Sequence, residues 1–288
     1  FASILTNTVL NYAFIFGKLG CPAMGVKGAA LATVISAAVS MGMNMAFSYG
    51  MHLPAGARPS EWLRQEKGFV GRFSKTVVPV IFNEGLWGVG TTMYSVFYGR
   101  MGDAAVAAMG VCTTINDLVW VAIFALMNAT AIIVGKALGA GDRERAYLYA
   151  KRMMAGAVAA GVALGLLVIA VRWPLVNIFS GLSYPVREKA QFILMLGALT
   201  IWFRAFNTIN IVGVLRSGGD TLFSLCLDVG TLWLVGVTST GLAALVFHWP
   251  LEWVYACTFL EEAVKMAVGI PHFKKRQWMN VLTEQPQG

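Results

Sequence analysis

The sequence is short of charge. Only 12% of its 288 residues are Asp, Glu, Lys or Arg, whereas 57% are hydrophobic and the mean hydropathy is +0.67. A soluble domain has about 25% charged residues, so this chain lacks the charge needed to cover a surface that faces water. Its apolar residues also form runs of about 20 or more, the length with which a helix crosses the hydrocarbon core. These features predict a polytopic membrane protein of the all-α class.

Motifs of enzymes and metal proteins are also lacking. The chain contains no HExxH, GxSxG, Walker A or CxxC pattern, so nothing in it indicates a catalytic or nucleotide-binding site. Its four cysteines are far apart, and three fall inside or at the edge of apolar runs, as small residues in helix packing do. We therefore expect no enzymatic activity, no cofactor and no metal site except one for sodium. Without a nucleotide site, a pump of this kind would be driven by an ion gradient.

Basic residues outnumber acidic ones, and the net charge is +8. They lie mainly between the apolar runs, which is typical of membrane topology signals, so we expect no nucleic-acid partner. Segments 51–75 and 136–152, the turn at 215–220 and the C-terminal tail contain 14 Lys and Arg residues, against 6 in the alternate loops. This excess predicts that these segments and the C-terminus lie in the cytoplasm.

The apolar runs predict about eight transmembrane helices. They cover residues 1–17, 28–50, 73–98, 105–135, 153–171, 189–214, 221–247 and 252–271. The longest polar stretch, 51–72, is interpreted as a linker between two helical bundles. The chain begins at Phe1 inside an apolar run, and we expect the N-terminus of the protein to lie upstream.

Ionisable residues inside the apolar runs are few, and each needs a reason because a charge in the bilayer is costly. Glu84 lies in PVIFNEGLWGVG, with apolar residues on both sides. Its carboxyl group can carry a proton or bind a sodium ion, or it can be a hydrogen-bonded structural group. Asp228 lies four residues after Ser224, which places both on one helix face. An interhelical hydrogen bond is the alternative interpretation of Asp228.

Two further groups of polar residues lie in the later spans. Arg204 shares a helix face with Asn207, and we expect it either to neutralise a carboxylate or to line a cavity. Glu261 and Lys265 have the i,i+4 spacing of a helical ion pair and are interpreted as mainly structural.

The first two spans carry neutral polar residues. Asn7 and Asn11 lie one turn apart in the first span, and Thr33 lies in the second. Two amide oxygens and a hydroxyl are hard ligands that suit an alkali cation. On spacing alone, hydrogen bonding between helices is the preferred interpretation.

Several local patterns occur in order along the chain: NTVLNYAFIFG, GVKGAALATVIS, PVIFNEGLWGVG, GKALGAGDRERA and VLRSGGDTLFSLCLDV. With the closing EEAVKMAVGIPHFKKRQWMNVLT, they resemble the multidrug and toxic compound extrusion (MATE) family over essentially all 288 residues. The resemblance implies two six-helix lobes. This chain would hold the last two helices of the first lobe (1–50), a cytoplasmic inter-lobe linker (51–72), the complete second lobe (73–272) and a cytoplasmic tail (273–288).

The resemblance also implies site residues. Asn7 and Thr33 match positions that hold sodium in some members, and Asn11 stands where those members have Asp. Glu84 matches the acidic residue on the seventh helix, which resembles the cation-coupling carboxylate of the second lobe. Asp228 lies where lobe symmetry places the counterpart of Asn11. We therefore predict a second-lobe cation site at Glu84 and Asp228, and a first-lobe cation site at the other three residues.

The implied function is a cation-coupled antiporter, driven by protons or sodium, that exports small organic cations. The two lobes would alternate between inward- and outward-open states. The protein is expected to be a monomer in the bacterial inner membrane. Candidate substrate-cavity residues are Trp87, Tyr94, Arg204 and Asn207, with core packing as the alternative for the aromatic pair.

Two other functions stay open. A flippase for lipid-linked oligosaccharides should carry a cationic cavity for a pyrophosphate head group. Arg204 is the only strong intramembrane candidate for it, which argues against this function. A membrane-embedded enzyme would need a catalytic dyad or metal cluster, which the sequence does not indicate. Because two helices and six do not make two lobes, we expect the isolated chain to be inactive.

Overall fold

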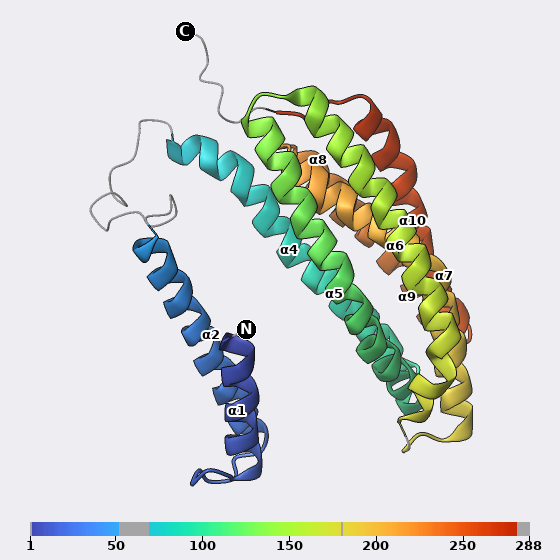
Figure 1. Ribbon diagram of the computed structural model, residues 1–288. Coiled ribbons are helices and arrows are strands. Elements are labelled where there is room, and N and C mark those ends of the chain that lie inside the picture. The colour runs from blue at the N-terminus through green and yellow to red at the C-terminus, as the bar shows by residue number, and fades with distance from the viewer. Residues whose placement is uncertain (1, 52–68, 180, 281–288) are drawn as a thin grey trace. The chain divides into compact units, whose positions relative to one another are not determined.

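The computed structural model describes residues 2–51, 69–179 and 181–280, which are all helical apart from turns and connections. The chain divides into two compact units, Phe1–Val70 and Gly71–Gly288. Figure 1 shows the helices of each unit coloured along the chain. Most of the predicted linker (52–68) and the end of the predicted tail (281–288) lie outside the described residues.

The first unit is a pair of helices, α1 (Ala2–Phe16) and α2 (Val26–Gly50). A short turn joins them, and its Gly17 and Gly25 adopt positive φ angles of 65° and 54°. The helices approach closely at Gly28, where a Cβ atom would lie 2.7 Å from the carbonyl oxygen of Phe14. Glycine at this point lets the two backbones touch, as small residues do in membrane helix pairs.

The second unit has three long helices first, α4 (Phe69–Arg100, of which the unit takes all but the first two residues), α5 (Asp103–Gly139) and α6 (Arg143–Asn177). Helix α4 continues through Pro79. Helix α7 (Tyr184–Thr208) follows and runs on as a π-helix over Ile209–Arg216.

A mixed helix comes next, with α8 (Thr221–Thr231), a π-helix over Leu232–Val237, α9 (Thr238–Gly241) and a second π-helix over Leu242–Val246. Helix α10 (Leu251–Lys274) ends the unit. Within the described residues the two units therefore contain eight helical stretches, in agreement with the eight spans expected from the sequence.

Five of the stretches are both long and apolar enough to cross a membrane: Val26–Gly50, Asp103–Gly139, Arg143–Asn177, Tyr184–Arg216 and Thr221–Val246. Helix α1 is apolar but has only 15 residues. Large apolar side chains cover much of the outside of these helices; Leu118 and Leu166, for example, are 69% and 63% exposed. A surface of this kind fits hydrocarbon and not water.

The interior of the second unit contains two separate apolar clusters. One joins the end of α5 and the start of α6 to the π-helix after α7 and the last turn of α10. The other joins the ends of α4 and α6 to the starts of α5, α7 and α10. Along α8 and α10, the charged residues Asp228, Glu261 and Lys265 lie between the residues of the two clusters.

Candidate functional site

Lys265 on α10 is the centre of a buried group of charges in the second unit. Its Nζ lies 2.5 Å from Glu261 Oε1, one turn earlier on the same helix, and 2.8 Å from Asp228 Oδ1 on α8. The Lys265 side chain is only 6% exposed. A buried ammonium group is tolerated where it is paired and hydrogen-bonded. The expected Glu261–Lys265 pair is confirmed, but it extends to Asp228, so Lys265 ties α10 to α8.

Asp228 has further partners beyond Lys265. Asn83 on α4 donates from Nδ2 to Asp228 Oδ2 at 2.9 Å, and Asn83 is 1% exposed. Arg216, at the end of the π-helix after α7, places Nη2 3.9 Å from the same oxygen. The interhelical hydrogen bond considered for Asp228 is therefore present, together with two ion pairs. Ser224, one turn away, binds Arg216 through its Oγ at 3.4 Å.

Glu84 joins this group through Arg216. The guanidinium Nη1 donates to Glu84 Oε1 at 2.6 Å, and the Glu84 side chain is 58% exposed within its unit. The carboxylates of Glu84 and Asp228 thus both face the Arg216 guanidinium. The predicted pair is joined through this arginine. Successive helical residues point about 100° apart, so Asn83 turns into the unit while Glu84 stays at its surface.

Tyr94 on α4 binds the same group of charges through Glu261. Its hydroxyl donates to Glu261 Oε2 at 2.7 Å. Gly236, in the π-helix after α8, leaves room for this bond, because a Cβ atom there would overlap both the Tyr94 hydroxyl and the Glu261 carboxylate. Tyr94 is therefore bonded to this group, whereas Trp87, the other aromatic candidate on α4, is 44% exposed. We call the joined set the charge cluster: Asn83, Glu84, Tyr94, Arg216, Asp228, Glu261 and Lys265.

Arg204 and Asn207 form a second polar group beside it. Asn207 donates from Nδ2 to both the carboxylate and the backbone oxygen of Glu262, at 2.8 and 2.9 Å. Arg204 Nε lies 3.9 Å from the same carboxylate, and Nη2 donates to Thr258 at 3.4 Å. Both residues were candidates for the substrate cavity. The structure places both beside Glu262, which gives the Arg204 guanidinium a carboxylate partner, as one of the two interpretations of Arg204 expected. Their part in a substrate cavity stays a prediction.

Irregular backbone and unpaired polar atoms mark the same region. π-Helical turns, which are frequent at functional sites, end at Arg216 and follow Asp228. Asn83 Oδ1 and both side-chain polar atoms of Asn210 are buried without a hydrogen-bond partner among the described residues. Asn210 lies against α10, since a Cβ atom on Gly269 would be 2.8 Å from its Nδ2. Buried polar groups without partners are uncommon and usually have a functional or solvent-related cause.

The first unit holds its polar residues by neutral hydrogen bonds. Asn11 donates to Asn7 Oδ1 at 2.8 Å, and Asn7 donates to Ser36 Oγ on α2 at 3.2 Å. Thr33 donates instead to the backbone of its own helix, at Ala29. The structure joins Asn7 and Asn11 directly and links Asn7 to α2 through Ser36, which the sequence did not single out. The Oδ1 atom of Asn11 is buried without a described partner.

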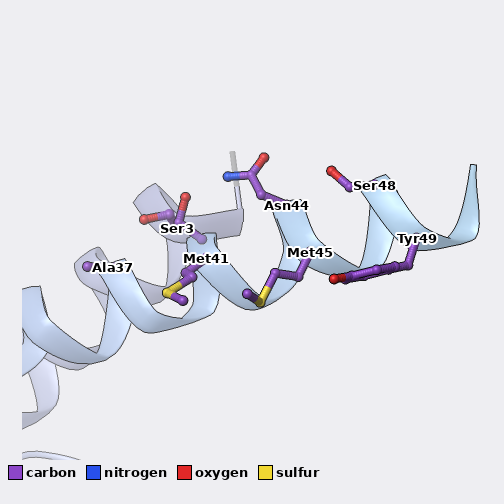
Figure 2. A pocket seen from close by; sticks show the side chains of 8 residues that line it. Ser3, Ala37, Met41, Asn44, Met45, Ser48 and Tyr49 are labelled. Atoms are coloured by element: carbon purple, nitrogen blue, oxygen red, sulfur yellow. The ribbon is translucent and has the colours of Figure 1, made fainter. Parts of the chain in front are cut away.

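A pocket of about 710 Å³ lies on the same unit. Figure 2 shows Ser3 from α1 beside α2, from which Asn44 and Ser48 project in one row and Met41, Met45 and Tyr49 in another. Each row has i,i+4 spacing, so each follows one helix face. The lining offers neutral hydrogen-bonding groups and polarisable apolar ones, and none of its residues is charged.

The chain is similar to known transporters in sequence. The MatE family model matches residues 79–240, more than half of the chain. The chain is 25% identical over 230 residues to the "Probable multidrug resistance protein NorM" of Thermotoga maritima. The aligned region covers 79% of this chain and 48% of that protein. It is 26% identical over 252 residues to the "Multidrug resistance protein MdtK" of Edwardsiella ictaluri, with coverage of 85% and 53%. The chain spans about half the length of the curated relatives it matches.

Solved structures show the same fold. A multidrug resistance MATE family transporter of the MOP superfamily in an outward-facing conformation superposes with a TM-score of 0.81 at 18% identity, over 99% of this chain and 62% of that one. The Vibrio cholerae MATE transporter VcmN gives a TM-score of 0.81 at 15% identity, over 98% and 62%. At this identity the likeness concerns the fold, and it confirms the all-α membrane fold expected from the sequence.

Proposed function

Because the chain belongs to the MatE family, we propose that it is part of a cation-coupled antiporter that exports small organic compounds. The protein is a multi-pass membrane protein and not an enzyme. The proposal adds a location in the bacterial inner membrane, a cytoplasmic C-terminus, a monomeric state and alternating access of two lobes. Relatives named as multidrug resistance proteins support the substrate class.

The observation that carries the proposal is an imbalance of charge in the charge cluster. Three carboxylates, those of Glu84, Asp228 and Glu261, face two bases, Arg216 and Lys265. The second polar group adds one base, Arg204, and one carboxylate, Glu262, so the excess of one carboxylate is unchanged. One negative charge is therefore unmatched in a membrane-embedded helical unit. A single proton or sodium ion would neutralise it, and buried charges favour such compensation strongly.

The geometry suggests how the ion would act. Glu84 is the exposed member and holds Arg216 at 2.6 Å, while Asp228 lies 3.9 Å from the same guanidinium. A cation that neutralises Glu84 weakens its hold on Arg216 and frees the guanidinium to move towards Asp228. Asp228 also holds Lys265, so the change would reach α8 and α10. A cation that binds one arrangement better than the other shifts the population of the two.

An organic cation is the substrate that this chemistry favours. Trp87 is the exposed aromatic residue one turn after Glu84 on α4, and an aromatic face beside a carboxylate attracts a positive charge. In the first unit, the methionines of the pocket in Figure 2 provide an adaptable apolar surface, and Asn44 provides hydrogen bonds without charge. Asn7, Asn11 and Thr33 are retained as a proposed first-lobe cation site, to which Asn11 Oδ1 would contribute.

The test is transport by the full-length protein that carries this sequence, reconstituted in proteoliposomes with proton and sodium gradients imposed separately. We expect the wild type to move a fluorescent organic cation and Glu84→Gln to lose most transport. Glu188→Gln is the matched control, because Glu188 is exposed at the start of α7 and outside the charge cluster. The gradient that drives transport identifies the ion.

Two results would contradict the proposal. Intact transport in Asp228→Asn, with none in Glu84→Gln, would separate the two carboxylates and remove the shared site. No transport by the wild type under either gradient would remove the efflux function and make a lipid-linked oligosaccharide flippase the next function to test.

A further inference from the structure

The turn between α5 and α6 carries a pocket that the proposed transport mechanism does not use. It has a volume of about 730 Å³. Its lining follows one face of each helix and the turn between them: Ile133, Lys136, Ala137, Ala140, Asp142, Arg145, Tyr149, Arg152 and Met153. The spacing of three to four residues within each helix makes the pocket a groove between two antiparallel helices.

The groove is strongly positive. It contains three bases and one carboxylate, Asp142. Asp142 is already engaged, because it caps α6 by accepting from the backbone N–H of Arg145 at 2.9 Å and pairs with the Arg145 side chain at 3.0 Å. Among the residues that the structure describes, no ion pair joins Lys136 or Arg152 to a carboxylate. Two unpaired bases therefore face one groove.

The next carboxylate along the chain, that of Glu144, does not line the groove. It accepts a hydrogen bond from Arg276, just beyond α10. The Arg276 guanidinium also lies 4.2 Å from the Tyr147 ring. Figure 1 shows the turn between α5 and α6 at the same end of the second unit as the end of α10. This contact leaves the charge of Lys136 and Arg152 uncompensated at the edge of an apolar helix pair.

The rest of the lining is apolar. Ile133 precedes Lys136 on α5 and Met153 follows Arg152 on α6, so both lie farther from the turn than the bases, and Ala137 lines the groove beside Lys136. Ile133 is 38% exposed and its neighbour Ile132 is 57% exposed. A free phosphate ion would gain nothing from these residues, whereas an acyl chain would bury them. Tyr149, with an apolar ring and a polar hydroxyl, suits the boundary between the two.

We propose that this groove binds the phosphodiester head group of an anionic phospholipid, held by Lys136 and Arg152, with an acyl chain along Ile133 and Met153. The cytoplasmic leaflet is rich in such lipids, and basic pockets between transmembrane helices on that side are suited to their head groups. The site is separate from the charge cluster and independent of the coupling ion. Its occupation would fasten the α5–α6 end of the lobe to one leaflet.

The experiment measures lipid binding by the purified full-length protein in a neutral detergent at about 150 mM salt, where surface fields are screened beyond about 8 Å. Binding is followed by native mass spectrometry and by the thermal shift that each ligand produces. The ligands are phosphatidylglycerol, phosphatidylcholine and inorganic phosphate. We expect phosphatidylglycerol to bind and to raise the melting temperature, and the other two to do neither.

Two double variants remove equal charge from the same segment. Lys136→Gln with Arg152→Gln changes the groove, and Arg143→Gln with Lys151→Gln changes two exposed bases outside its lining. We expect the groove variant to bind phosphatidylglycerol about 30-fold more weakly, at about 1 kcal/mol for each base removed. The control should stay within about threefold of the wild type because its bases act through screened solvent.

Each alternative outcome would overturn the proposal. Equal losses of phosphatidylglycerol binding in both double variants would mean that the lipid is attracted by diffuse surface charge and not by the groove. Equal binding of phosphatidylcholine would mean an apolar surface without head-group selection. If inorganic phosphate raises the melting temperature and phosphatidylglycerol does not, the groove binds a free ion and not a lipid. If the groove double variant does not fold, the single variants are measured. Lys136→Gln is then compared with Arg143→Gln, and Arg152→Gln with Lys151→Gln.

Discussion

The two units of this chain bury polar residues in different ways. In the first unit, Asn7, Asn11 and Ser36 are joined by hydrogen bonds between neutral groups on two adjacent helices. In the second unit, the charge cluster joins side chains from α4, α8, α10 and the π-helix after α7. Breaking a hydrogen bond between neutral amides in a membrane protein costs little free energy. Removing the partner of a buried charge costs much more, because the remaining charge is left uncompensated. The comparison predicts that the second unit responds far more strongly to loss of a polar group.

The largest effect is expected for Lys265→Met, which tests whether the second unit depends on its bases. The substitution leaves Asp228 and Glu261 buried without their shared counter-ion. We expect the free energy of unfolding to fall by about 3–5 kcal/mol, measured by thermal and denaturant unfolding of the full-length protein in detergent. Lys189→Met removes an exposed base from α7 and should change little. Equal stability of the two variants would mean that the ion pairs do not hold the unit.

An intermediate effect is expected for Gly236→Ala, which disturbs the charge cluster without removing a charge. The added methyl group would overlap the Tyr94 hydroxyl and the Glu261 carboxylate. We expect a loss of about 1–3 kcal/mol from overpacking, seen in the same unfolding measurement. Gly230→Ala is the control on the preceding turns, because a Cβ atom there meets nothing within 4 Å. A neutral result for Gly236→Ala would show that Tyr94 and Glu261 can shift to make room for the methyl group, and that Gly236 is not required by the charge cluster.

The smallest effect is expected in the first unit, for Asn7→Ala. This change removes hydrogen bonds to Asn11 and Ser36 but leaves no charge unpaired. Polar contacts between membrane helices average about 0.6 kcal/mol, and we expect a loss of that size. Asn44→Ala is the control, since Asn44 is exposed on α2. A loss as large as that of Lys265→Met would abolish the distinction between the two units.

Helix positions followed from the sequence more reliably than helix ends. The apolar run at 153–171 indicated a span, but α6 extends from Arg143 to Asn177. Hydropathy reports only the part of a helix that meets hydrocarbon. The first turns of α6 are charged and begin at Asp142, whose side chain caps the helix. A capping side chain stabilises a helix end whether or not lipid surrounds it.

The candidate site was recovered only in part. Glu84 and Asp228 stood out because a carboxylate in an apolar run is rare. Arg216 belongs to the turn at 215–220 that was predicted to be cytoplasmic, and Asn83 was not among the predicted site residues. The structure brings all four together, because the long Arg216 side chain reaches back from the helix end and Asn83 faces α8.

The sequence by itself determined that this chain crosses a membrane as helices, that it carries the MatE pattern and that a few carboxylates lie inside apolar spans. These properties are local, because hydropathy, helix spacing and motif order need no knowledge of what packs against what. The tertiary structure decided which charge meets which. Arg216 and Glu84 are 132 residues apart in the chain, and Lys265 reaches Asp228 on a different helix. An ion pair requires opposite charges within a few ångströms, and only the packing of the helices supplies that distance.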